Sequence, residues 1–145
     1  MKKKLPIGIE DFKEIIEKDC YYVDKTLFIK ELLDNSSKVR LFTRPRRFGK
    51  TLALSMLRYY FEKEITVEGR AGYNSRLFRG LKILDAGESY LSHMGQYPVI
   101  SLSLKSAKQP SFEMAYASIL DELALEFDRH KSVLYSDEFS EDEKA

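Results

Sequence analysis

The residues best suited to chemistry lie together between Thr43 and Thr51. This segment reads Thr43-Arg44-Pro45-Arg46-Arg47-Phe48-Gly49-Lys50-Thr51. Gly-Lys-Thr ends a phosphate-binding loop, in which backbone N–H groups and a helix N-terminus surround a phosphate. In that interpretation Gly49 lets the backbone approach the phosphate, Lys50 neutralises its oxygens and the Thr51 hydroxyl holds Mg²⁺.

The predicted elements on either side of this segment support the interpretation. Residues 38–43 are predicted as a strand, residues 44–49 as a loop and residues 50–61 as a helix. The full Walker A pattern is Gly-x-x-x-x-Gly-Lys-Ser/Thr, and Arg44 stands where its first glycine belongs. The residues therefore leave an alternative open, a basic loop that caps a core helix or contacts nucleic-acid backbone.

Other elements are expected before and after the loop. The predicted helices are 9–18, a second one capped by Asp24 and ended by Asn35, short ones around 75–84 and 87–94, and a long one from the Ser111 cap to about residue 131. Residues 97–104 are predicted as a second strand. We divide the chain into a helical lead-in (1–37), a part with both strands and the long helix (38–135) and an acidic tail (136–145).

Composition sets the class of protein. With 145 residues, 43% hydrophobic and 32% charged, the chain is typical of one globular domain. It has no apolar run of the roughly 20 residues that cross a bilayer and no signal-peptide core, so we expect a cytoplasmic protein without membrane contact. A single cysteine, Cys20, excludes an internal disulfide. The net charge is +1, but residues 1–51 carry 13 Lys/Arg against 8 Asp/Glu, which favours an anionic ligand.

Longer stretches of the sequence resemble a known family. They are Tyr22-Val23-Asp24-Lys25-Thr26, the run from Leu41 to Leu52, Ser55-Met56-Leu57 and Tyr60-Phe61. Together they resemble the start of the bacterial AAA-ATPase-like domain family, whose own Walker A version is Arg-Pro-Arg-Arg-Phe-Gly-Lys-Thr. The resemblance extends from about Leu5 to Leu104 and more loosely through the long helix.

This resemblance implies a fold and a ligand. The fold is an α/β, P-loop NTPase-like three-layer sandwich, incomplete here and preceded by N-terminal helices. The ligands are ATP and Mg²⁺, with Thr51 on the metal ion. The implied phosphate-binding residues are Arg46, Arg47, Phe48, Gly49, Lys50, Thr51 and Leu52. The segment from Tyr22 to Thr26 resembles the element beside adenine, although an apolar segment that leads into a capped helix is also typical of a core.

The resemblance also indicates what these residues lack. Hydrolysis needs a strand that ends in Asp or Asp-Glu, which orders Mg²⁺ and the attacking water, and no predicted strand here ends that way. In the family that Walker B strand comes later, so the chain looks like an N-terminal portion of the ATPase domain and has no assigned catalytic residue. A nuclease-like domain often follows in the family. A nucleic-acid-binding or regulatory module without ATP turnover is the alternative function.

Overall fold

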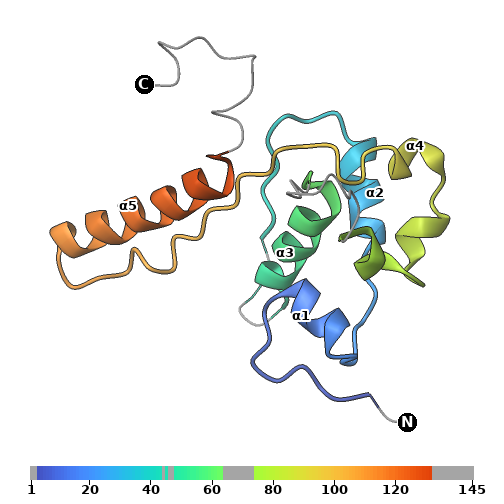
Figure 1. The fold of residues 1–145 in the computed structure, drawn as a ribbon, viewed down its shortest axis with the longest axis horizontal. Helices are drawn as coiled ribbons and strands as arrows, with labels where there is room; N and C mark the ends of the chain where they lie inside the picture. Colours follow the sequence, from blue (N-terminus) through green and yellow to red (C-terminus); the bar gives the residue numbers. More distant parts are fainter. Residues whose placement is uncertain (1–2, 44, 46–47, 64–73, 132–145) are drawn as a thin grey trace. The chain divides into compact units, whose positions relative to one another are not determined.

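The described part of the chain is helical. A computed structural model describes residues 3–43, 45, 48–63 and 74–131. Its elements, in order, are α1 (Phe12–Glu17), α2 (Leu27–Asp34), α3 (Lys50–Phe61), the 3₁₀ helices η1 (Asn74–Phe78) and η2 (Lys82–Asp85), α4 (Glu88–Leu91) and α5 (Phe112–Arg129) (Figure 1). The chain forms two compact units, Met1–Val99 and Ile100–Ala145. The predicted acidic tail lies outside the described residues.

The predicted three-layer α/β sandwich is wrong for this structure. No β-strand is present among the described residues, and their β pairing is limited to the isolated bridges Lys4–Cys20 and Glu62–Tyr97. Residues 38–43 and most of 97–104 run without regular structure. The physical reason is that a strand needs a neighbouring segment to pair with its N–H and C=O groups, and among the described residues no segment pairs with 38–43 in this way.

Local signals explain where α1 begins. Its N-cap is Asp11, whose Oδ1 accepts a hydrogen bond from the Glu14 N–H at 3.0 Å. The other oxygen, Oδ2, accepts hydrogen bonds from Ser55 Oγ at 2.9 Å and from the Tyr59 hydroxyl at 3.1 Å. Ser55 Oγ in turn accepts the Phe12 N–H at 2.9 Å. The start of α1 is therefore bound to the middle of α3, against which α1 packs (Figure 1).

The core of the first unit joins α1, α2, α3 and both 3₁₀ helices. Its buried members are Phe12, Ile29, Met56, Tyr60, Leu77, Phe78 and Ile83. The Phe78 ring lies 5.0 Å from the Phe12 ring and 5.2 Å from the Tyr60 ring, measured between centroids. Such aromatic contacts add to the hydrophobic stabilisation of a small core. This core gives α3 a fixed position from which its first turn projects.

Polar bonds attach η2 to the start of α2. Asp24 Oδ1 accepts hydrogen bonds from the Thr26 N–H at 2.8 Å and the Thr26 hydroxyl at 2.6 Å, and its Oδ2 accepts the Lys82 N–H at 2.8 Å. Buried Thr26 Oγ1 accepts the Ile83 N–H at 3.2 Å. The sequence predicted Asp24 as the helix cap. Instead α2 begins after Thr26, and the Asp24 carboxylate organises the turn before it.

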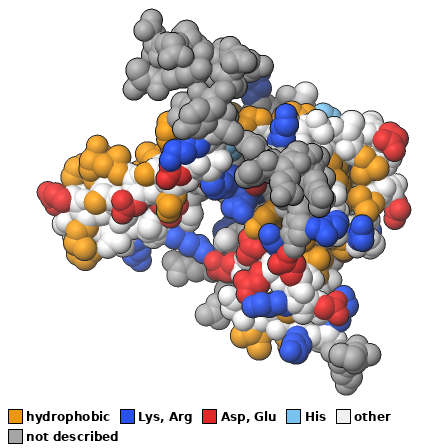
Figure 2. Space-filling model, in the orientation of Figure 1, with side chains coloured by type: hydrophobic (Ala, Val, Ile, Leu, Met, Phe, Trp, Pro, Cys, Tyr) orange, Lys and Arg blue, Asp and Glu red, His pale blue; other side chains and the backbone are white. Residues whose placement is uncertain are grey.

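The second unit consists of α5 and the extended segment before it. Ser111 caps α5 as predicted, accepting the Met114 N–H at 3.3 Å. Glu126 is buried and accepts the Ser101 N–H at 2.7 Å, so a side chain pairs with backbone that was predicted to belong to a strand. Large apolar side chains of α5 are exposed, Leu123 at 45% and Phe127 at 59%, and apolar side chains appear on this helix in Figure 2.

Candidate functional site

Gly49 has a backbone conformation that favours glycine. It precedes α3 with φ 74° and ψ 26°, in the left-handed region where a side chain is strained. A Cβ at this position would meet no atom within 4 Å, so the requirement for glycine concerns backbone conformation and not space. No side chain caps α3. The N–H groups of its first turn, at the positive end of the helix dipole, are thus suited to an anion.

Lys50 is the first residue of α3, and its side chain turns back toward Pro45. Its Nζ donates a hydrogen bond to the Pro45 carbonyl at 3.1 Å, and the side chain is exposed. The ammonium group therefore lies beside the backbone of Pro45, which precedes it in the chain. A surface ammonium that donates to a carbonyl can exchange that carbonyl for a phosphate oxygen, because a charged acceptor forms the stronger hydrogen bond.

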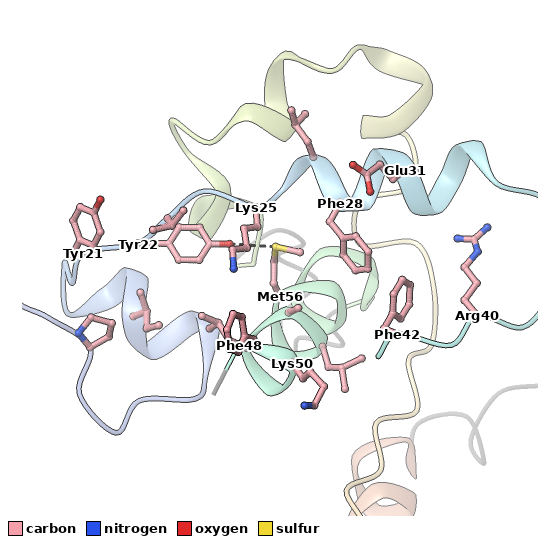
Figure 3. Close-up of a pocket in the computed structure, with 18 residues that line it drawn as sticks. Tyr21, Tyr22, Lys25, Phe28, Glu31, Arg40, Phe42, Phe48, Lys50 and Met56 are labelled. Carbon is pink, nitrogen blue, oxygen red and sulfur yellow. Dashed lines mark hydrogen bonds between the residues drawn. The ribbon is translucent and has the colours of Figure 1, made fainter. Parts of the chain in front are cut away.

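A cavity of about 850 Å³ opens beside this loop (Figure 3). Most of its wall comes from residues 21–31, from Arg40 and Phe42 of the extended segment, and from residues 48–56 at the start of α3, and Pro6 and Ile15 complete it. The volume is within the range of small-molecule sites, roughly 300–1,000 Å³. The cavity therefore brings the predicted phosphate loop and the segment around Tyr22 to one site.

Tyr22 and Met56 form an apolar wall of this cavity. The Tyr22 hydroxyl donates to Met56 Sδ at 3.4 Å, as Figure 3 shows. The Tyr22 ring packs edge-on against Phe12 with 5.4 Å between centroids. Burial raises the pKa of Tyr22 to about 12, so this phenol is neutral at physiological pH. The wall is suited to a flat uncharged group such as a base.

Side chains fasten the segment before the loop to α2. The Phe42 ring lies 4.7 Å from the Phe28 ring in an edge-to-face contact. The Arg40 guanidinium donates a hydrogen bond to the Leu32 carbonyl, while its buried Nε has no hydrogen-bond partner. These two contacts hold residues 38–43 in place without a β ladder. They also bring Arg40 and Phe42 into the cavity wall.

The charged side chains of the cavity favour an anionic ligand. Lys25, Arg40 and Lys50 line it, against the one carboxylate of Glu31. No group of three or more His, Cys, Asp or Glu side chains that could hold a metal ion is present in the part of the chain that the structure describes. A divalent ion at this site would therefore depend on oxygens of the ligand as well as on the protein.

The structure brings most of the described predicted site residues to the cavity. Phe48, Gly49, Lys50 and Leu52 line it; Thr51 is exposed and is not part of its wall. Arg46 and Arg47 lie outside the described residues.

Sequence reasoning missed Phe28, Arg40 and Phe42 as parts of the site. A signal for two of them exists, because Arg40 and Phe42 alternate with Val39 and Leu41 and so share one side of the extended segment. That side faces the cavity, whereas Val39 and Leu41 are each 87% exposed.

Comparisons with known proteins identify a family and a bacterial relative. A family model described as predicted AAA-ATPase matches residues 6–144. An uncharacterized protein in the vnfD 5' region of Azotobacter chroococcum mcd 1 is 43% identical over 103 residues, which are 70% of this chain and 17% of that relative. The chain thus spans about a sixth of the length of the relative that it matches. No solved structure matches. Among the described helices, none is long and apolar enough to cross a membrane.

Proposed function

The chain belongs to the predicted AAA-ATPase family, and from this membership we propose that the cavity beside Gly49 binds ATP. The family supports an ATPase-like module in general. The finer proposal is that residues 46–52 act as a variant Walker A loop, with Arg44 in the position of the usual first glycine.

One observation carries this proposal. The start of α3 and the segment around Tyr22, which are far apart in sequence, line the same cavity. A nucleotide needs a cationic end for its phosphates and an apolar end for its base. Lys50 and the uncapped first turn of α3 supply the first. Tyr22, Phe28 and Met56 supply the second.

Each residue of the loop has a role in this proposal. Gly49 places the backbone close to the phosphates, and Lys50 exchanges the Pro45 carbonyl for their oxygens. Arg46 and Arg47 add positive charge, and Phe48 and Leu52 border the cavity. The Thr51 hydroxyl is the protein ligand proposed for Mg²⁺, an ion that neutralises phosphate charge when bound. With no cluster of acidic side chains in the described residues, phosphate oxygens and water would complete its coordination.

The proposal concerns binding. Hydrolysis requires in addition an acidic or amide group that orients the attacking water. In the described part of the chain, Glu31 on α2 is the carboxylate that lines the cavity. Phosphate release is therefore measured separately from nucleotide binding.

The test is titration of the protein with a fluorescent ATP analogue in the presence of Mg²⁺. Saturable binding is expected, and Lys50→Ala should weaken it by about 100-fold or more, because the substitution removes a charged hydrogen-bond donor from the phosphates. Lys38→Ala is the matched control, since Lys38 is an exposed lysine of the same unit that does not line the cavity. Equal binding by wild type and Lys50→Ala would reject the proposal. Salt-sensitive retention on DNA without nucleotide binding would favour the alternative, a nucleic-acid-binding module.

A further inference from the structure

Lys25 lies in a turn between two residues, Asp24 and Thr26, whose side chains form hydrogen bonds to η2. Asp24 on one side accepts the Lys82 N–H at 2.8 Å, and Thr26 on the other accepts the Ile83 N–H at 3.2 Å. Both neighbours therefore face η2. Lys25 lines the cavity instead, where Figure 3 shows its side chain near Tyr22 and Met56. The turn that Asp24 organises thus directs one ammonium group toward the ligand site.

The Lys25 ammonium has no ion pair within the described part of the chain, and its side chain is exposed. Lys50, by comparison, donates to the Pro45 carbonyl. The carboxylate next to Lys25 in sequence, that of Asp24, is occupied by hydrogen bonds from Thr26 and Lys82. Within the described part of the chain, the Lys25 ammonium is thus a cation of the cavity wall that forms no ion pair.

We propose that Lys25 is a second phosphate-binding residue of this site, contributed by the segment before α2. It holds the polyphosphate of the nucleotide together with Lys50, which lines the same cavity. This inference rests on the proposed function. It adds that the segment resembling an adenine-side element also contacts the charged part of the ligand.

Lys25 belongs to the segment that Asp24 and Thr26 attach to η2, and Lys50 belongs to α3. A polyphosphate held by both ammonium groups would connect these two parts of the unit across the cavity. Binding would then stabilise the fold by mass action, more for a triphosphate than for a nucleoside.

The experiment compares the affinities of wild type, Lys25→Ala, Lys25→Arg and Lys38→Ala for ATP, ADP, AMP and adenosine, by calorimetry or by competition with the fluorescent analogue. If Lys25 binds phosphate, Lys25→Ala should lower the affinity for ATP by about 10- to 100-fold. It should lower the affinities for ADP and AMP progressively less and leave that for adenosine unchanged. Lys25→Arg keeps the charge and should restore most of the ATP affinity. Lys38→Ala should bind all four ligands as wild type does.

The outcomes separate this inference from the proposed function. If wild type binds ATP and Lys50→Ala does not, but Lys25→Ala binds ATP as wild type, the inference is wrong and the proposed function stands. An equal loss of affinity for ATP and for adenosine in Lys25→Ala also overturns the inference, because Lys25 then contacts the base or stabilises the fold. Absence of ATP binding by folded wild type rejects both.

Discussion

The carboxylate of Asp11 accepts a hydrogen bond from Ser55 Oγ at 2.9 Å, so the residue that caps α1 also anchors α3. Ser55 completes the link by accepting the Phe12 N–H at 2.9 Å. The two residues are far apart in sequence and belong to the two helices whose packing fixes the direction of α3. The helix that begins at Gly49 is therefore held by a polar contact as well as by the apolar core.

Replacing Ser55 tests the strength of this link. Ser55→Ala removes a donor to Asp11 and leaves the Phe12 N–H without its acceptor in a partly buried place, so we expect a loss of about 1–3 kcal/mol in the free energy of unfolding. The measurement is urea denaturation followed by circular dichroism. Ser36→Ala, at an exposed serine after α2, is the control and should change stability by less than about 0.5 kcal/mol. Equal stability of Ser55→Ala and wild type would show that the link contributes nothing.

Gly49 provides a second prediction, on backbone strain. Because φ is 74° and a Cβ would meet no atom within 4 Å, Gly49→Ala should cost about 1–2 kcal/mol of stability from conformation alone. Gly49→Asn should cost less than Gly49→Val, since asparagine tolerates the left-handed region and a β-branched residue does not. Thermal unfolding of the three variants gives the order. A valine variant as stable as the asparagine variant would contradict the left-handed conformation.

The pH dependence of stability provides a third prediction. Burial alone would raise the pKa of the Asp24 carboxyl, but hydrogen bonds from Thr26 and from the Lys82 N–H lower it below its ordinary value of 3.8. A lowered pKa in the folded state means that the charged carboxylate stabilises the fold above pH 3.8, and that this contribution is lost as the pH falls through the folded pKa.

Asp24→Asn makes this contribution measurable. The difference in unfolding free energy between wild type and the variant should be largest near neutral pH and should shrink below pH 3.8. Urea denaturation at a series of pH values gives the curve. The control is Asp85→Asn, at an exposed carboxyl of η2. A difference that does not change with pH would mean that ionised Asp24 contributes no more than a neutral amide.

Tyr22 provides a fourth prediction. Burial raises the pKa of Tyr22, and that of Tyr60, from 10.0 to about 12. Below pH 10.0 the stabilisation from the neutral phenol is complete, and it is lost as the pH rises toward about 12. Ultraviolet absorbance titration of wild type should show a late phase of phenol ionisation, and Tyr22→Phe should reduce its amplitude. An unchanged late phase would contradict the buried environment of Tyr22.

The ring and the hydroxyl of Tyr22 have separable effects on stability. Tyr22→Phe loses a weak bond to Met56 Sδ and should cost less than about 1 kcal/mol. Tyr22→Ala removes the ring that packs on Phe12 and should cost about 3 kcal/mol. Comparable costs for both variants, measured by urea denaturation, would show that the hydroxyl and not the ring stabilises this wall.

The sequence alone predicted the elements whose signals are local. The range 50–61 was predicted for α3 and is confirmed, because helical spacing and a preceding glycine mark it within one segment. The Ser111 cap of α5 is confirmed for the same reason, since the capping bond joins Ser111 to Met114 in the next turn. The family was also predicted from contiguous motifs and is shown by the match to residues 6–144.

Only the tertiary structure decided whether the predicted strands pair and which residues form the walls of the cavity. Residues 38–43 have a strand pattern, but a strand exists only where another chain segment accepts its hydrogen bonds, and in the described structure Arg40 and Phe42 attach this segment to α2 by side chains. The direction of Lys25 likewise follows from bonds that Asp24 and Thr26 make to η2, far along the chain. Local periodicity specifies helices because their hydrogen bonds are local, whereas sheets and ligand cavities depend on contacts between segments that no local pattern contains.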